Sequence, residues 1–263
     1  MNIPELLQER YGKPHLSYSS LKVALTDMAK FDQYMKGELK FESPALTFGT
    51  LYDMLLFERD KAMDLYQIVN HEYILERCSD KTRDAKSPKM TKDYKETKAA
   101  IEVELKEKGK EIVSPEDWKQ ANEMIDRLDL CGLSNDYLSS RDFQVEFNEM
   151  IGDVRVKGFL DCYDGDKGFI VDSKSTQSVS KFRYSVRDFC YDIQAYIYCK
   201  VFGVKKFYWL VQEKAYPYLP AIVECSEETL FAGEMKFNEA VDRIKKFLSE
   251  DSEPQKDFLS FKI

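Results

Sequence analysis

The spacing of hydrophobic residues changes from a helical to a strand-like pattern near the middle of the chain. In the first half, apolar residues recur every three or four positions, as Phe48, Leu51 and Leu55 do, which is the spacing of one buried helix face. Ser114 and Pro115 form a typical helix start before a similar run. Helices are therefore predicted within 15–37, 43–61, a charged stretch ending near 108, and 114–130.

From residue 143 onward, short apolar runs bounded by turn residues predict β-strands. The expected strands are 143–151, 154–164, 168–174, 206–213 and 218–225. A helix over 186–202 separates the third strand from the fourth, and an amphipathic helix from about 226 to 248 follows the last strand. A helical first half followed by a sheet with a crossing helix indicates an α/β or α+β protein.

Charge narrows the possible partners. The 263 residues carry a net charge of -8, which argues against a protein that coats nucleic acid through bulk electrostatics. One local cluster is positively charged, because residues 81–98 hold seven Lys or Arg against three acids. Composition alone favours a solvated surface segment there.

The spacing of the cysteines and the length of the apolar stretches indicate in which cellular compartment the protein works. The six cysteines include no CxxC pair, which argues against a zinc or iron–sulfur site. Apolar stretches such as "FYWLV" are too short to cross a bilayer, and the first residues lack the pattern of a signal peptide. We expect a cytoplasmic protein without a membrane segment.

The predicted hairpin around "DGDKG" carries the candidate chemistry. If Gly165 faces Gly168, the same register places Asp161 opposite Asp172. Directly opposed residues of an antiparallel pair have Cβ atoms about 4.5–5.5 Å apart, where like charges are destabilising. Lys174 lies two positions after Asp172 and therefore points to the same face. Two carboxylates and a lysine are thus expected to converge at one end of the sheet.

Three arrangements would stabilise such a pair of carboxylates. One carboxyl group could remain protonated. Lys174 could neutralise the pair as a structural ion pair. A hard divalent cation such as Mg²⁺ or Mn²⁺ could also bind between the two groups. The residues alone support the ion pair at least as well as the cation.

The hairpin motifs resemble a known family. "GFLD", ending at Asp161, and "VDSK", ending at Lys174, are similar to the PD-(D/E)XK nuclease signature in its variant ending D-x-K. Glu146 lies one strand earlier, where this superfamily often has a glutamate. "QAYIY" resembles the QxxxY motif of the RecB-like branch, and its spacing places Gln194 and Tyr198 on one helix face.

Other segments extend the resemblance over residues 16–248. "LSYSSLK", "ALTFGTLYD", "GKEIVSPEDW" and "QEKAYPY" are similar to stretches of phage and prophage RecE-type (exonuclease VIII-like) exonucleases, in the same order. The resemblance implies a restriction-endonuclease-like α/β core, a central mixed sheet flanked by helices, with a helical N-terminal half. Residues 1–263 would form one nuclease domain, with the mainly helical part in 1–140 and the catalytic sheet in 141–263.

The resemblance also implies roles at the hairpin. Asp161 and Asp172 would bind Mg²⁺, for which Mn²⁺ can substitute, and Lys174 would orient or activate the attacking water. Glu146 would bind a metal or its water, although a partly exposed strand glutamate explains it nearly as well.

Further residues are implied outside the hairpin. RecB-like members usually carry a His four positions after the Gly of "FGT", and here that position is Asp53, which is either a third metal ligand or an ordinary helix residue. Gln194 and Tyr198 would brace the site or contact the DNA backbone, although helix packing with polar tips explains them nearly as well. Lys86 and Lys89 of the basic segment would track along DNA.

The implied activity is Mg²⁺-dependent exonuclease digestion of linear duplex DNA. The resemblance implies 5′-to-3′ degradation of one strand, which leaves single-stranded tails for phage-type recombination with a RecT-like annealing protein. It also implies a homo-oligomeric ring around DNA. Two alternatives remain: an endonuclease or structure-specific nuclease with the same core, and a catalytically inactive DNA-binding or assembly protein, which Asp53 in the usual His position keeps open.

Overall fold

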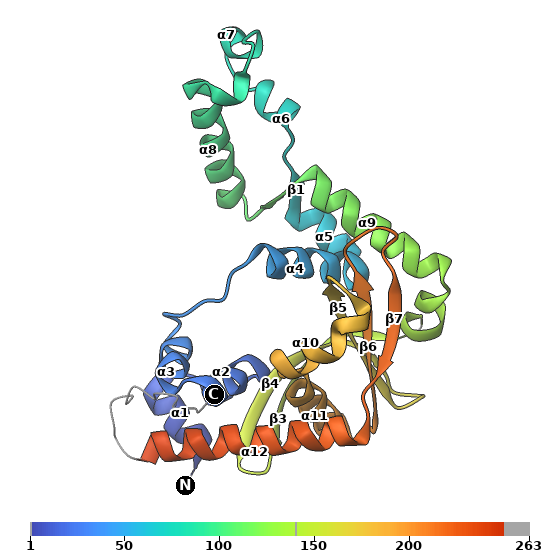
Figure 1. The fold of residues 1–263 in the computed structure, drawn as a ribbon. Helices are drawn as coiled ribbons and strands as arrows, with labels where there is room; N and C mark the ends of the chain where they lie inside the picture. Colours follow the sequence, from blue (N-terminus) through green and yellow to red (C-terminus); the bar gives the residue numbers. More distant parts are fainter. Residues whose placement is uncertain (1, 140, 250–263) are drawn as a thin grey trace, which may run out of the picture. The chain divides into compact units, whose positions relative to one another are not determined.

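A computed structural model of the protein describes residues 2–139 and 141–249 (Figure 1). The chain divides into two compact units, which are described separately. The first unit comprises Met1–Ser43 and Gly132–Ile263, and the second comprises Pro44–Cys131. The first residues of the predicted helical half thus belong to the same unit as the sheet. A single domain over 1–263 stays a prediction.

A five-stranded mixed sheet forms the centre of the first unit. Its strands are β3 (Asp142–Ile151), β4 (Val154–Asp164), β5 (Phe169–Thr176), β6 (Lys206–Glu213) and β7 (Pro220–Glu224), in that spatial order. β5 and β6 are parallel, and every other neighbouring pair is antiparallel. The predicted α/β class with a central mixed sheet is confirmed, and the strand positions agree with those expected from the alternation of apolar residues.

The β4–β5 hairpin has the register that the turn residues predict. Cys162 lies opposite Val171, so Asp161 and Asp172 occupy the next facing positions. Gly168 closes the turn at φ 66°, a left-handed conformation that residues with a Cβ rarely adopt. The turn therefore fixes which carboxylates face each other.

Helices connect β5 to the parallel strand β6, because parallel strands require a long crossover. The crossover consists of η3 (Val179–Lys181), α10 (Phe182–Asp188) and α11 (Tyr191–Phe202). The expectation of one helix over 186–202 was wrong. Cys190 adopts a left-handed conformation at φ 57°, which ends one helix and starts the next.

Four more helices complete the described part of the first unit, together with the single π-turn η2 (Ser134–Leu138). They are α1 (Ile3–Tyr11), α2 (Tyr18–Thr26), α3 (Met28–Lys36) and α12 (Glu227–Ser249). One helix was expected within 15–37, but Asp27 interrupts it and two helices form instead. The extended backbone of Asp27 and its carboxylate, which accepts the N–H groups of Ala29 and Lys30, start a new helix there.

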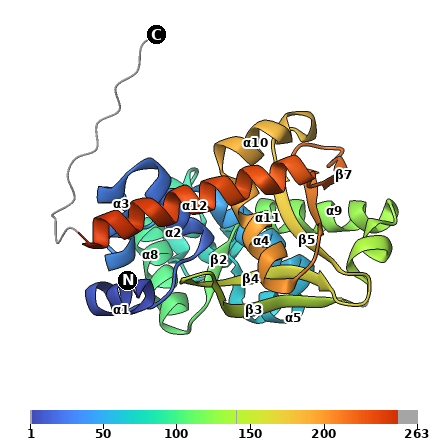
Figure 2. The same ribbon diagram turned by 90° about the horizontal axis from the view of Figure 1, so that it is seen from below.

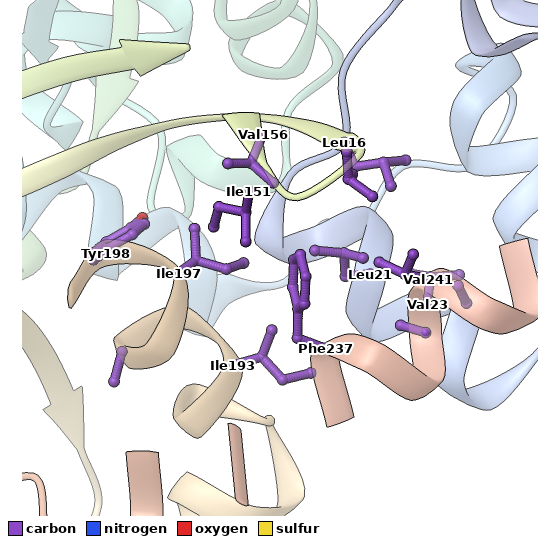
Figure 3. Close-up of a cluster of buried hydrophobic side chains, with 14 of the residues drawn as sticks. Leu16, Leu21, Val23, Ile151, Val156, Ile193, Ile197, Tyr198, Phe237 and Val241 are labelled. Carbon is purple, nitrogen blue, oxygen red and sulfur yellow. The ribbon is translucent and has the colours of Figure 1, made fainter. Parts of the chain in front are cut away.

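The core of the first unit lies between the sheet and these helices. Figure 3 shows Ile193 and Ile197 of α11 among Phe237 of α12, Leu21 of α2 and Ile151 of β3. α12 packs along both α2 and α11 (Figure 2). α11 also contacts β3 and β6, so it is held between α12 and the sheet, which matters because it carries Gln194 and Tyr198.

The second unit is mainly helical. Its elements are α4 (Pro44–Phe57), α5 (Arg59–Leu65), β1 (Tyr66–Ile68), α6 (His71–Leu75), α7 (Asp80–Arg83), η1 (Pro88–Met90), α8 (Lys92–Glu107), β2 (Glu111–Val113) and α9 (Pro115–Leu130). Ser114 caps α9 as predicted, accepting the Asp117 N–H at 3.0 Å. The parallel pair β1–β2 was not expected, because three residues show no periodicity. The basic segment 81–98 is largely helical.

Within residues 2–139 and 141–249, no helix is both long and apolar enough to span a membrane.

Gly233 allows α12 to approach α11 closely. A Cβ on Gly233 would lie 2.1 Å from the backbone oxygen of Asp192, so the helices would have to separate. Gly233→Ala is expected to lower the free energy of unfolding by about 1–3 kcal/mol through overpacking. Gly49→Ala on α4 is the control, because its Cβ would meet nothing within 4 Å and should stabilise by about 0.5–1 kcal/mol. Urea unfolding measures both, and a neutral Gly233→Ala would contradict this packing.

Candidate active site

Asp161 and Asp172 meet where the β4–β5 ladder ends. The last recorded pair is Cys162 with Val171, and Asp161 and Asp172 lie one position beyond it. There the backbone N–H of Ser173 donates to Oδ2 of Asp161 at 2.8 Å. A side chain thus replaces a backbone partner at the strand end, and this bond fixes the Asp161 carboxylate beside β5.

Asp172 is a buried carboxylate with two partners. It is 1% exposed, its Oδ2 pairs with the Lys174 ammonium, and its Oδ1 accepts a hydrogen bond from Gln194 Nε2 at 2.9 Å. Burial raises the pKa of the Asp172 carboxyl above its ordinary value, while Lys174 and Gln194 oppose the rise. Both partners therefore favour the charged carboxylate.

Lys174 remains cationic in this setting. Burial alone would lower its pKa, but the carboxylates of Asp172 and Asp161 outweigh burial and hold the pKa above its ordinary value. Its Nζ also lies 5.0 Å from the centre of the Tyr191 ring, within range of a cation–π contact. At neutral pH the group is thus a fixed positive charge rather than a proton acceptor.

Gln194 and Tyr198 reach Asp172 from one face of α11. The Gln194 amide nitrogen donates to Asp172 and also to the Tyr198 hydroxyl, the latter at 3.2 Å. Tyr198 is buried and packs edge-on against Phe147, with ring centres 5.3 Å apart. The structure therefore brings both residues of the QxxxY motif to the hairpin end, although their proposed contact with DNA stays a prediction.

Sequence reasoning missed two residues of α2 that lie near this group. Burial lowers the pKa of Lys22, and the Lys174 cation lowers it further. Lys22 Nζ lies 5.4 Å from the centre of the Tyr18 ring, and the Tyr18 hydroxyl donates to the backbone oxygen of Phe189. Both residues belong to "LSYSSLK", and the place of this segment in the family resemblance was the available signal.

Glu146 has a different environment. It lies opposite Phe159, two positions along β4 from Asp161, and its side chain is 54% exposed. Its carboxylate forms an ion pair with Lys157 at 2.8 Å. A metal-binding role for Glu146 stays a prediction, and this ion pair is the competing explanation.

Three predicted residues belong to the second unit. Asp53 is half-buried on α4, Lys86 lies between α7 and η1, and Lys89 lies in η1. Lys89 also lines a pocket of ≈ 840 Å³ together with His71 and Tyr94. The proposed roles of Asp53, Lys86 and Lys89 stay predictions.

The hairpin end offers two carboxylates rather than a complete set of metal ligands. Within the described ranges, no group of three or more His, Cys, Asp or Glu side chains is placed to bind a metal. Mg²⁺ commonly uses only one or two carboxylates, with waters and substrate phosphate oxygens completing its shell. Gln194 Oε1 is buried without a hydrogen-bond partner in the described structure, as an acceptor for a metal-bound water would be. Asp161 and Asp172 therefore fit a hard divalent cation that binds together with a phosphate.

The fold and the hairpin define a class: PD-(D/E)XK-like domains, with the two acids and the lysine on adjacent strands of a mixed sheet. Residues 17–257 match the family described as PDDEXK-like domain of unknown function (DUF3799), and the chain belongs to this family.

Two crystal structures illustrate the similarity. A provisionally assigned exonuclease from Eubacterium rectale superposes with a TM-score of 0.62 at 19% identity, covering 95% of this chain and 90% of the other. A phage-related exonuclease from Haemophilus somnus 129PT gives a TM-score of 0.34 at 14% identity, covering 64% of this chain and 90% of the other. A comparison with curated protein sequences finds no significant match. At this identity, the first structure shows a shared fold.

The hydrogen bond from Gln194 to Asp172 predicts a pH-dependent loss of stability. Gln194→Leu is expected to cost about 1–3 kcal/mol at pH 7.5, because a buried charged carboxylate loses a donor. The substitution raises the already elevated pKa of Asp172 further. The loss should therefore shrink as the pH falls and the carboxyl becomes protonated in the folded state.

Urea unfolding at several pH values measures this loss. Tyr198→Phe is the matched control, because it removes a hydroxyl that bonds to Gln194 while leaving the bond to Asp172 in place. A loss for Gln194→Leu that is the same at every pH would show that Gln194 does not act through the Asp172 charge.

Proposed function

We propose that the protein is a divalent-cation-dependent nuclease that hydrolyses phosphodiester bonds of DNA. The observation that carries the proposal is that Asp161 and Asp172 lie one position beyond the last pair of the β4–β5 ladder, Cys162 with Val171, and that Lys174 forms an ion pair with Asp172. Paired carboxylates beside a fixed cation suit a cation and a phosphate that bind together. Membership in a PDDEXK-like family supports the same chemistry.

In this proposal, each residue of the hairpin end has a distinct task. Asp161 and Asp172 hold Mg²⁺ or Mn²⁺, which when bound lowers the pKa of a water and stabilises the leaving oxygen. Lys174, which carries its proton, offsets the charge of the phosphate and positions the attacking water. Gln194 keeps one oxygen of Asp172 fixed, so that the carboxylate presents a constant geometry. Asp53 and Glu146 are proposed as further ligands of the metal or its water.

We further propose a specific substrate and polarity. The segments similar to RecE-type enzymes support exonuclease action on linear duplex DNA ends, 5′-to-3′, leaving single-stranded tails for recombination with a RecT-like annealing protein. A homo-oligomeric ring in the cytoplasm fits the charge distribution, because a chain with a net charge of -8 has to bring its few cationic regions to the DNA. Lys86 and Lys89 are proposed to contact the DNA backbone.

Digestion of 5′-labelled linear duplex DNA tests the activity, with closed circular DNA of the same sequence alongside. Wild-type protein with Mg²⁺ should release label from the linear DNA and leave the closed circles uncut, and chelation by EDTA should abolish the release. Asp172→Asn is expected to lower the rate at least about 100-fold, in the range found when one charge-stabilising group of an active site is removed. Glu149→Gln, an exposed carboxylate on β3, is the control and should leave the rate unchanged.

Three other outcomes of this assay would contradict the proposed activity or the assigned site. Cutting of the circular DNA would indicate an endonuclease. Digestion that survives Asp172→Asn would contradict the assigned site. No digestion with either Mg²⁺ or Mn²⁺ would favour the DNA-binding alternative, in which Asp53 in the usual His position marks a lost activity.

A further inference from the structure

The short helix α10 exposes a cationic and aromatic surface. Tyr184 is 45% exposed, and the guanidinium carbons of Arg183 and Arg187 lie 4.8 Å and 5.8 Å from the centre of its ring. Arg183 also donates to the Tyr184 hydroxyl at 2.8 Å. The ring is thus held in place by two cations while much of it remains accessible to solvent.

Aromatic contacts connect this surface to the hairpin end. Phe189, directly after α10, is 50% exposed, and its ring centre lies 5.6 Å from that of Tyr191. Tyr191 in turn lies 5.0 Å from Lys174 Nζ. Lys174 and Asp172 both belong to β5, so these contacts lead from α10 to the strand that carries Asp172.

The interactions within the protein do not neutralise this surface. Arg187 pairs with Asp188, with contacts of 2.8 and 2.9 Å. No ion pair of Arg183 is recorded within the described residues, so the surface has an excess of positive charge. Exposed arginines and large aromatic rings gain little from folding, because they stay in contact with water. An anionic ligand with flat, apolar groups matches both features.

We propose that the α10 surface, formed by Arg183, Tyr184, Arg187 and Phe189, binds a single-stranded segment of DNA next to the scissile phosphate. The arginines contact phosphates, and bases stack on the rings of Tyr184 and Phe189. A single strand is the occupant because bases in a duplex already stack on each other, whereas unpaired bases are free to stack on aromatic side chains. The inference rests on the proposed nuclease function and specifies where one strand of its substrate binds.

The charge contribution can be measured as a salt slope. Binding of a fluorescent oligothymidine of about 16 nucleotides, the upper end of common site sizes, is followed by anisotropy in EDTA at increasing NaCl. Each phosphate contact to a single strand contributes about −0.7 to the slope of log K against log[salt]. Arg183→Ala/Arg187→Ala should therefore make this negative slope shallower by about 1.4.

A matched control removes two cations elsewhere in the same unit. Lys205 and Lys206 are exposed, and Lys206 pairs with Phe169 at the start of β5, whereas α10 follows the other end of that strand. Lys205→Ala/Lys206→Ala should leave both slope and affinity unchanged. If the control loses as much affinity and salt dependence as the α10 variant, the effect reflects the total charge of the protein. That result would overturn the proposal.

The stacking contribution can be separated from charge at Tyr184. Tyr184→Leu should weaken binding about 5-fold or more, because stacking of one base is worth about 1 kcal/mol or more. Tyr184→Phe keeps the ring and should bind within about 2-fold of wild type. Equal weakening by Leu and Phe would show that the hydroxyl acts rather than the ring, which would contradict stacking.

The outcomes distinguish this surface from the nuclease activity. If the wild-type protein hydrolyses DNA and Arg183→Ala/Arg187→Ala binds the oligonucleotide as tightly as wild type, the proposed role of the α10 surface is overturned. The proposed nuclease activity then still stands. Binding that depends on α10 in a wild-type protein that hydrolyses no DNA would support the surface and overturn the nuclease. Failure of the wild-type protein to bind the oligonucleotide would overturn the surface outright.

Discussion

The buried carboxylate of Asp172 is the constraint on which the arrangement of this protein depends. A charged group with almost no exposure must find its compensation within the protein. Lys174 provides it from the same strand, and Gln194 provides it from α11. α11 also packs against α12 and the sheet, and a shift of this helix would remove the Gln194 hydrogen bond and leave Lys174 as the partner of the carboxylate. The stability of the core and the geometry of the candidate site are thus coupled through one side chain.

Local sequence was sufficient to predict the hairpin. The turn residues set the register, and strand alternation then placed Asp161, Asp172 and Lys174 on one face without knowledge of the rest of the chain. Tyr18 and Lys22 could not be found in this way. They approach the hairpin end because α2 packs against α11 and α12, and no local periodicity encodes such a contact. The helix breaks at Asp27 and Cys190 were missed for a related reason: each depends on the backbone conformation of a single residue.

In the proposed function, an acidic protein has to bind a polyanion, and its uneven distribution of charge would allow this. The net charge of -8 is spread over the whole sequence, while Lys174, Lys22 and the arginines of α10 lie in one part of the first unit. The electrostatic field at a ligand is dominated by nearby charges, because salt screens the more distant charges. In the proposed function, the acids at the hairpin end require a cation, and the surrounding basic side chains receive the phosphates.

In the proposed function, Asp161 and Asp172 together form a divalent-cation site. Calorimetric titration of the DNA-free protein with Mn²⁺ tests it without reference to catalysis, using Asp161→Asn, Asp172→Asn and the exposed-carboxylate control Glu149→Gln. Saturable Mn²⁺ binding is expected in the wild type and in Glu149→Gln, and its loss is expected in both aspartate variants. Equal Mn²⁺ binding in all four proteins would show that the cation binds elsewhere, and Asp172 would then be only a structural partner of Lys174.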